Sequence, residues 1–241
     1  MPSAIEVLAL EQVAYDVWRA PEAEELDGWR LRFAHGLTGR ANSVWPNGYG
    51  VLPLAEKIAR VEAWYAHRGL PARFQLTDAA RPVQLAGALE ARGYRQPAPS
   101  VSVETAALPA TPTGGADVRE ELDDEWLALW AGSRRFDDLG VARALLLGSP
   151  GHTAFARIGE VAIGRGVAVD GWLGVTSMVT VPEARRRGHA REILGVLVAW
   201  GRDRGCTRAV LQVESTNAPA RALYAGFGFR PSHEYRYVVA R

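Results

Sequence analysis

Apolar positions along the chain recur with two different periods, and the period changes repeatedly. Steps of three and four residues are typical of helices with one buried face. The predicted helices are Ile5–Trp18, Leu54–His67, Pro82–Arg92, Glu120–Trp130, Asp138–Leu147, Ala190–Asp203 and Pro219–Ala225. Short alternating or continuous apolar runs between glycines and prolines are typical of strands. The predicted strands are Gly28–Phe33, Ala41–Trp45, Ala72–Thr77, Ser100–Thr105, Thr153–Ile158, Val161–Val169, Trp172–Val181, Arg208–Glu214 and Tyr235–Ala240.

One stretch near the middle of the chain interrupts both periods. Residues Ala106–Ala116 are rich in Ala, Thr, Pro and Gly, a composition typical of a linker. A chain of 241 residues is long enough for two ordinary domains. Because helices and strands are mixed on both sides of this stretch, we predict an α/β protein with domains over 1–105 and 117–241 and a linker over 106–116.

The two halves resemble each other when they are aligned with an offset of about 136 residues. The aligned pairs are Trp45-Pro46 with Val181-Pro182, Trp64 with Trp200, Arg68-Gly69 with Arg204-Gly205 and, with the offset one residue shorter, Gly93-Tyr94-Arg95 with Gly228-Phe229-Arg230. The predicted elements also follow in the same order in both halves. The alignment therefore predicts a tandem repeat of one fold, against the alternative that short Gly and Trp matches coincide by chance.

Charge is nearly balanced, with 28 Lys and Arg against 27 Asp and Glu and a formal net charge of +1. This balance argues against a nucleic-acid or membrane-surface role. The longest apolar run, Ile193–Trp200, is far shorter than the roughly 18 residues of a membrane span, and the acidic N-terminal stretch is unlike a signal peptide. A lone Cys206 excludes an intrachain disulfide and a cysteine metal cage. We therefore expect a cytoplasmic protein without a metal centre.

A basic loop lies between the predicted strand Trp172–Val181 and the helix that follows it. Pro182 ends the strand because proline has no N–H to donate to a sheet, and Arg185-x-x-Gly188-x-Ala190 comes next. The N-terminus of a helix carries unpaired N–H groups and a partial positive charge, and small residues let an anion approach them. The loop is predicted to bind a pyrophosphate. The residues expected to hold it are Arg185, Arg186, Arg187, Gly188, His189, Ala190 and Arg191.

Two motifs connect these observations to a known family. Arg185-x-x-Gly188-x-Ala190 resembles the acetyl-CoA pyrophosphate loop of the GNAT superfamily of N-acetyltransferases, (Gln/Arg)-x-x-Gly-x-(Gly/Ala). Asn217-x-x-Ala220-x-x-Leu223-Tyr224-x-x-Phe227-Gly228-Phe229 resembles the second signature of that family, Asn-x-x-Ala-x-x-Leu-Tyr-x-x-x-Gly-Phe, at all its fixed positions. The resemblance covers roughly Ala116–Arg241, and over the first half it rests on the internal repeat alone.

The resemblance implies two tandem GNAT-like domains, each a mixed, mostly antiparallel twisted sheet flanked by helices, with acetyl-CoA as co-substrate. It places Val179 and Val181 in the acetyl-CoA site, with the backbone N–H of Val179 as the donor to the acetyl oxygen. It also assigns Asn217 and Tyr224 to the cofactor site. In the first half, Tyr49–Leu54 aligns with the loop but has no basic residue. We therefore expect the first half to be degenerate and to lack a cofactor site.

Acetyl transfer to an amine needs an acid for the departing thiolate and a group that takes the amine proton. In the family, the tyrosine at the position of Tyr224 lies beside the sulfur, and a phenol pKa near 10 is close to that of an alkyl thiol. Some members carry a glutamate base in a Leu-Glu-Val strand, where this chain has Leu211-Gln212-Val213. Glu214 lies on the same strand face and is the substitute that we consider. A histidine or a water chain is the alternative base, and a purely structural role is the alternative for both Tyr224 and Glu214.

We expect an acetyl-CoA-dependent N-acetyltransferase that acts on a primary amine, either a small molecule or a peptide N-terminus or lysine. A non-catalytic acyl-CoA-binding regulatory module is the alternative, because it would keep the loop without needing Tyr224. We expect no nucleic-acid or membrane partner. The sequence leaves open the identity of the acceptor and whether the chain is a monomer or a homodimer.

Overall fold

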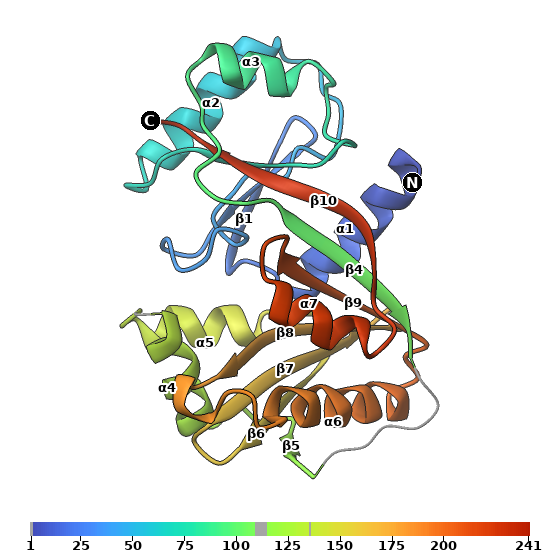
Figure 1. The fold of residues 1–241 in the computed structure, drawn as a ribbon. Helices are drawn as coiled ribbons and strands as arrows, with labels where there is room; N and C mark the ends of the chain where they lie inside the picture. Colours follow the sequence, from blue (N-terminus) through green and yellow to red (C-terminus); the bar gives the residue numbers. More distant parts are fainter. Residues whose placement is uncertain (1, 109–114, 135) are drawn as a thin grey trace.

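The computed structural model describes residues 2–108, 115–134 and 136–241. Within these residues the centre of the fold is an eight-stranded sheet with the strand order β3-β10-β4-β9-β8-β7-β6-β5. Strands β8 and β9 pair in parallel, and the other neighbours in the sheet are antiparallel. The sheet is mixed and mostly antiparallel, as predicted, and it runs through the whole molecule (Figure 1).

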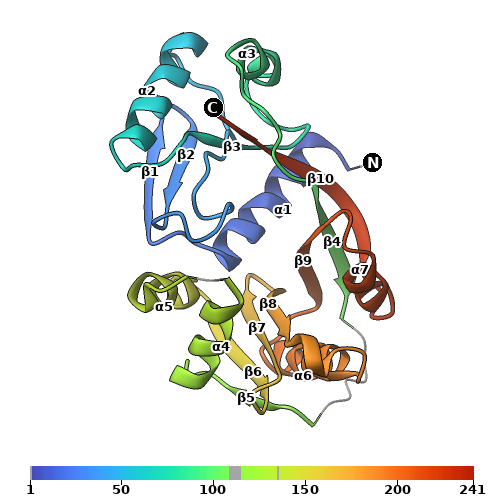
Figure 2. The ribbon, with the colours of Figure 1, turned by 60° about the vertical axis from the view of Figure 1, so that its left-hand side comes forward.

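The second half of the chain builds the lower part of the molecule in Figure 1. Its strands are β5 (Asp117–Arg119), β6 (His152–Ile158), β7 (Ala162–Val169), β8 (Trp172–Thr180), β9 (Arg208–Glu214) and β10 (Arg230–Val239). Helix α6 (His189–Asp203) packs its apolar stripe on one face of this sheet, and α4 (Asp124–Arg134) and α5 (Leu139–Leu147) cover the other face (Figure 2). The short helix α7 (Ala218–Ala225) connects β9 to β10.

The first half of the chain forms a smaller core of its own above this sheet. Its elements are α1 (Ala4–Val17), β1 (Glu22–Leu26), β2 (Trp29–Phe33), α2 (Leu54–Ala66), β3 (Arg73–Leu76), α3 (Leu85–Ala91) and β4 (Val101–Ala107). The β1–β2 hairpin, α2 and α3 enclose fully buried Trp29, Ile58 and Phe74. In Figure 2 these elements lie together at the top.

The two halves share one main sheet, whereas the sequence predicted a separate sheet for each. Strand β4 lies between β9 and β10 and pairs with β9 from Val101 opposite Glu214 to Ala107 opposite Arg208. The last strand, β10, pairs first with β4 and then, through Arg236–Val239, with β3. Figure 2 shows β10 crossing from the lower to the upper part of the molecule. The prediction was wrong because an apolar pattern shows which face of a strand is buried, not which strands it pairs with.

Helix α1 belongs to the first half of the chain and packs on strands of the second half. Its Leu10 and Val17 belong to a buried cluster with Val103, Val167 and Val210 from three strands. A Cβ atom at Gly174 of β8 would lie 2.2 Å from Val17 Cγ2, so the helix approaches the strand where there is no side chain.

A buried polar cluster joins the same helix to two strands. Glu11 of α1 accepts a hydrogen bond of 2.6 Å from Gln75 Nε2 of β3 and lies 2.8 Å from His233 Nε2 of β10. Buried polar groups that are mutually satisfied in this way fix the relative placement of the elements that carry them.

The positions of the helices agree with the apolar periods, and the main differences concern short or polar elements. Strands β1 and β5 were not predicted, because Glu22–Leu26 is mostly acidic and β5 is very short. Ala41–Trp45 is not a strand, and Val44 and Trp45 form isolated bridges instead. Helix α4 begins at Asp124 rather than Glu120, and β10 begins at Arg230 rather than Tyr235.

The predicted linker falls partly in a strand and partly outside the described residues. Ala106 and Ala107 continue β4, and residues 109–114 are not described. In the part of the chain that is described, no helix combines the length and the apolar character needed to cross a membrane.

Candidate acetyl-CoA site

Strands β8 and β9 begin side by side and then separate. Their parallel pairing runs from Trp172 opposite Arg208 to Val175 opposite Leu211 and stops there. Both strands continue, β8 along β7 to Thr180 and β9 along β4 to Glu214. A cleft therefore opens at the carboxyl ends of two parallel strands, a common position for ligands in α/β sheets.

A bulge in β8 marks the point of separation. Ser177 and Met178 together lie opposite Gly164, because the pairing with β7 jumps from Arg165–Thr176 to Ile163–Val179. Ser177 has a φ of 56°, in the left-handed region. A Cβ atom at Gly164 would lie 2.5 Å from Ile193 Cγ2 and 2.6 Å from Met178 Sδ, so the bulge requires glycine opposite it. Bulges bend strands and redirect groups near sites, and this one opens the cleft.

A cavity of about 460 Å³ occupies the cleft. Residues from both halves line it: Thr176, Ser177 and Met178 of β8, Gln212, Val213 and Glu214 of β9, Asn217, Ala220 and Tyr224 at α7, Val101, Tyr235 and Tyr237 of β4 and β10, Arg134 of α4, and Trp18, Thr38, Gly39, Arg40 and Val175. The sequence predicted Asn217, Tyr224 and Glu214 as site residues, and the fold brings these three together.

The basic loop connects β8 to α6 through a tight turn. Pro182–Ala184 forms a single 3-10 turn, and Arg186 and Gly188 then adopt φ values of 63° and 91°. Gly188 is the N-cap of α6, and a Cβ atom there would meet no atom within 4 Å. The loop is therefore open to solvent directly in front of the helix N-terminus.

Backbone donors in this loop are unpaired. The N–H groups of Arg186, Arg187, Gly188, His189 and Ala190 donate to no acceptor among the described residues. Unpaired donors at a helix N-terminus, with its partial positive charge, bind anions such as a pyrophosphate. The loop residues thus fit the phosphates of acetyl-CoA.

Two of the predicted loop contacts differ from expectation. The Arg191 N–H donates to the Gly188 carbonyl at 2.9 Å, so Arg191 has only its side chain to offer. Its guanidinium lies 5.5 Å from the ring centroid of Phe227. The exposed Arg185 donates from Nε to the Thr180 carbonyl at 3.3 Å, which holds the loop against the end of β8.

The N–H groups near the end of β8 alternate between pointing toward β7 and pointing toward the cleft. The Val181 N–H donates to the Val161 carbonyl at 2.9 Å, so it is not available to a ligand. Since the hydrogen-bonding direction alternates along a strand, the Val179 N–H also faces β7, and Thr180 between them faces the cleft. The pairing with β7 therefore turns the Val179 N–H, which the resemblance implies as a backbone donor, away from the cleft, and it uses the N–H of Val181, the other residue expected in the cofactor site.

Helix α7 carries the second signature and holds it rigidly. Asn217 is the N-cap, and its Oδ1 accepts a hydrogen bond of 3.2 Å from the Ala220 N–H. Arg221 links the helix to the neighbouring strand by donating from Nε to buried Glu104 Oε1 at 3.1 Å. Tyr224 packs against Phe229 with a centroid distance of 6.0 Å.

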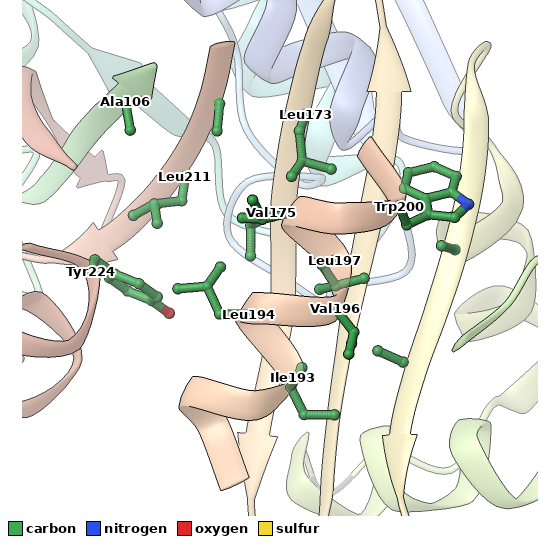
Figure 3. Close-up of a cluster of buried hydrophobic side chains, with 14 of the residues drawn as sticks. Ala106, Leu173, Val175, Ile193, Leu194, Val196, Leu197, Trp200, Leu211 and Tyr224 are labelled. Carbon is green, nitrogen blue, oxygen red and sulfur yellow. The ribbon is translucent and has the colours of Figure 1, made fainter. Parts of the chain in front are cut away.

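Tyr224 stands at the edge of the main apolar cluster, beside Leu194 (Figure 3). The side chain is 8% exposed and lines the cavity, and its hydroxyl has no hydrogen-bond partner in the described part of the chain. Burial, reinforced by the carboxylate of Glu104, raises the pKa of Tyr224 to about 12. The phenol is thus fully protonated at neutral pH and is a weaker acid than the sequence-based value near 10 suggests.

Glu214 is the only carboxylate among the described residues that line the cavity. It is the exposed last residue of β9. Gln212, two residues earlier, is engaged, because the Tyr235 hydroxyl donates to its Oε1 at 3.0 Å. None of His152, His189 and His233 lines the cavity, and His233 is paired with Glu11.

Sequence reasoning missed the contribution of the first half to this cavity. Trp18, Thr38 and Arg40 come from positions with no motif, and the Trp18 Nε1 donates to Thr38 Oγ1 at 3.2 Å. No local signal marks them, because only the shared sheet and the packing of α1 bring them to the cleft. No group of His, Cys, Asp and Glu suited to a metal ion occurs in the described residues.

Comparison with known proteins agrees with the two motifs. A family model described as "Probable histone acetyltransferase Rv0428c C-terminal" matches residues 4–238. The chain belongs to this GNAT acetyltransferase family. It is 30% identical over 241 residues to "Probable histone acetyltransferase Rv0428c" of Mycobacterium tuberculosis, which covers 98% of this chain and 74% of the relative. It is 25% identical over 248 residues to "Uncharacterized N-acetyltransferase YobR" of Bacillus subtilis, covering 98% of this chain and 99% of that protein.

Solved structures share the fold of this GNAT protein. A GCN5-related N-acetyltransferase from Kribbella flavida superposes with a TM-score of 0.67 at 16% identity and covers 100% of this chain and 96% of its own. A tandem GNAT protein from the clavulanic acid biosynthesis pathway gives a TM-score of 0.55 at 15% identity over 77% of this chain and 69% of its own. The first likeness spans both halves, so the α/β arrangement described here is one that other GNAT proteins adopt.

Proposed function

We propose that this GNAT protein transfers the acetyl group of acetyl-CoA to a primary amine by direct attack of the amine on the thioester. The observation that supports the proposal is the cleft between β8 and β9, whose cavity is lined by both Tyr224 and Glu214. The loop with unpaired donors follows directly from the strand that forms one wall of this cleft.

The residues of the loop and of β8 have separate roles in binding the cofactor. Unpaired N–H groups from Arg186 to Ala190 hold the pyrophosphate, assisted by the exposed side chains of Arg185, Arg186 and Arg187. The extended pantetheine arm lies along the cleft edge of β8 and forms hydrogen bonds with its backbone, as an added strand would. Thr180 is one of the backbone partners. A backbone N–H near the bulge at Ser177 and Met178 holds the acetyl oxygen as negative charge develops on it.

Two side chains handle the protons of the reaction. The amine nitrogen forms its bond to the acetyl carbon while the carbon–sulfur bond breaks. Tyr224 donates its hydroxyl proton to the departing sulfur, and Glu214 takes the proton that the amine loses, directly or through one water. Proton exchange with solvent then restores both side chains.

The first half of the chain is a degenerate GNAT-like unit in this proposal. Its α2–β3–α3 order corresponds to α6–β9–α7, and Gly93 and Gly228, which follow the last helix of each set, both have a φ of 87°. Fully buried Leu89 stands where the repeat alignment has Tyr224. The first half therefore has no equivalent of the proposed acid.

The place of the pyrophosphate loop in the first half is already occupied by an anion of the chain itself. The carboxylate of Asp27 accepts hydrogen bonds from the Val51 N–H at 2.8 Å and the Leu52 N–H at 3.0 Å, just before α2. Lys57 Nζ lies 3.5 Å from the same carboxylate. These hydrogen bonds lower the pKa of Asp27, so the carboxylate is ionised at neutral pH. In this proposal the two N–H groups that Asp27 occupies are closed to a phosphate, whereas the loop before α6 keeps its donors open.

Incubation of the purified protein with acetyl-CoA and a panel of amines tests the proposal. The panel includes a lysine side chain in a peptide, because the name of the Mycobacterium tuberculosis relative describes histone acetylation. We expect free thiol and acetylated amine to appear in equal amounts. Binding of acetyl-CoA without thiol release for any amine would overturn the proposal and would favour a regulatory acyl-CoA-binding module.

A further inference from the structure

The charged side chains that line the cavity carry more positive than negative charge. Arg40 and Arg134 line it, against the carboxylate of Glu214. A third arginine, Arg165 of β7, lies behind the wall and is 0% exposed. It donates to the Val17 carbonyl at 2.9 Å and to Ser149 Oγ at 2.8 Å, and it lies 3.4 Å from Thr176 Oγ1, whose residue lines the cavity.

Arg40 and Arg165 lie near each other and neither is paired with a carboxylate in the described part of the chain. Their guanidinium carbons are each 5.6 Å from the ring centroid of Trp18. The Nε atom of each is buried and has no acceptor among the described residues. Burial, together with the positive charge of Arg40, lowers the pKa of Arg165 to about 9. Arg165 is thus a fully buried cation, Arg40 is a half-buried cation near it, and neither has a carboxylate partner among the described residues.

Buried cations without a partner are costly, and proteins normally pair them. An anion in the cavity would supply negative charge beside these cations and would accept from Arg40, which lines the cavity, whereas Arg165 lies behind the wall and already donates to neighbouring groups. The phosphates of acetyl-CoA are not suited to this role, because the residues of the loop that is proposed to hold them do not line this cavity. The remaining candidate for the anion is the acceptor.

We propose that the acceptor amine carries a carboxylate, as amino acids and related small amines do, and that Arg40 binds this carboxylate while Arg134 adds positive charge. This inference rests on the acetyl-transfer function proposed above and narrows its substrate class. In this proposal the carboxylate lies beside Arg40 and the amine lies beside Glu214 and Tyr224, and all three residues line the same cavity. An arginine fork matches the two oxygens of a carboxylate.

The same charges disfavour other amines. A polyamine or a lysine-rich peptide would bring further positive charge next to Arg40 and Arg134, and like charges repel most strongly where water is scarce. An amine with a phosphate in place of the carboxylate would satisfy the guanidinium groups, so the test has to separate the two anions.

Matched acceptors give the first part of the test. We expect kcat/KM for an amino acid to exceed that for its carboxamide, and that for the amine without the carboxyl group, by about tenfold or more, the size of a charge-assisted hydrogen bond. Equal rates across the set, or faster acetylation of a phosphorylated amine, a polyamine or a lysine-rich peptide, would overturn the assignment.

Variants give the second part. Arg40→Gln should raise KM for the amino acid by about tenfold or more. For the amine without the carboxyl group, kcat/KM should change by less than about threefold, because that amine makes no contact with the guanidinium. Arg134→Gln should have a smaller effect of the same kind. Arg60→Gln is the matched control, because Arg60 lies on the exposed side of α2 and pairs with Glu56. Arg40→Gln with an unchanged preference for the amino acid would contradict the proposal.

Two controls separate this inference from the proposed function. Calorimetric titration of acetyl-CoA should give the same affinity for Arg40→Gln and the unsubstituted protein, because the cofactor contacts lie elsewhere. Titration of the same acceptors into the protein with CoA bound reports the carboxylate preference even if no turnover is found. Turnover without a preference refutes the carboxylate site alone, and a carboxylate preference without turnover refutes the transfer reaction alone.

Discussion

Tyr224 is the residue on which the proposed chemistry depends most. It is held by Phe229 and by α7, and its hydroxyl faces a cavity rather than a protein partner. Tyr224→Phe keeps the ring and its packing but removes the acid, so kcat should fall by roughly 10²–10⁴-fold, the usual range for general acid catalysis. The comparison is kcat at saturating acetyl-CoA, with the melting temperature as the control for packing. A fall of less than about threefold, roughly 0.7 kcal/mol of barrier, would remove Tyr224 from the mechanism.

The pKa of Tyr224 sets the expected pH dependence. Burial raises the pKa of Tyr224 to about 12. The hydroxyl therefore keeps its proton, and can act as an acid, as the pH rises through 10, and it loses the proton only near pH 12. We therefore expect that titration of Tyr224 does not lower kcat between about pH 8 and 10. Any decline of kcat in this range should also be present in Tyr224→Phe. A descending limb near pH 10 that disappears in the variant would show that the phenol has an ordinary pKa in the complex.

Gly188 tests the loop at the same scale. Its φ of 91° is costly for a β-branched residue, and a side chain would project where the pyrophosphate approaches. Gly188→Val should weaken acetyl-CoA binding by roughly tenfold or more, about 1.4 kcal/mol. Gly205→Val is the matched control, since Gly205 follows the other end of α6 with a φ of 79° and open space around it. Equal affinities in the two variants would refute the loop as the cofactor site.

Single residues also show which parts of the candidate site could be predicted from the sequence. Asn217 and Tyr224 were predicted from a local signature, and the structure places both on the cavity. The N–H of Val179, which the resemblance implies as a donor, faces β7, because the direction of an N–H depends on strand pairing and not on the motif. Arg40 was not predicted at all, since its role depends on packing between distant segments.

Among the elements, α1 packs directly on the backbone of β8 at Gly174. At Gly174 a Cβ atom would lie 2.2 Å and 2.4 Å from the two Cγ atoms of Val17. Gly174→Ala should reduce the free energy of unfolding by about 1–3 kcal/mol through overpacking. Val17→Ala removes those two methyl groups, so the double variant should cost less than the sum of the single ones. Denaturant unfolding measures the cycle, and strictly additive losses would show that α1 does not sit on β8 as described.

Element positions were largely predictable, and element partners were not. The apolar stripe of α6 and the strands β6 to β9 follow their sequence periods closely. The insertion of β4 between β9 and β10 has no signature in its own residues, because an alternating strand fits several neighbours. The prediction of two sheets failed at this point, although the strands themselves were found.

At the scale of the whole molecule, the two halves share one main sheet but contribute different parts of the proposed site. The second half leaves backbone donors unpaired in front of α6, whereas in the first half Asp27 accepts from the N–H groups of Val51 and Leu52 in front of α2. The first half contributes instead a wall of the cavity, through Trp18, Thr38 and Arg40. The molecule as a whole is therefore expected to use a single cofactor and to build the acceptor side of its site from both halves.

Calorimetric titration of the unsubstituted protein with acetyl-CoA tests this account most directly, because it counts the sites and requires no knowledge of the acceptor. We predict one site per chain, with an affinity that weakens in Gly188→Val and is retained in Gly205→Val. Two sites of similar affinity would show that Asp27 does not block the first half, and the absence of any site would contradict the assignment of the loop before α6 to acetyl-CoA.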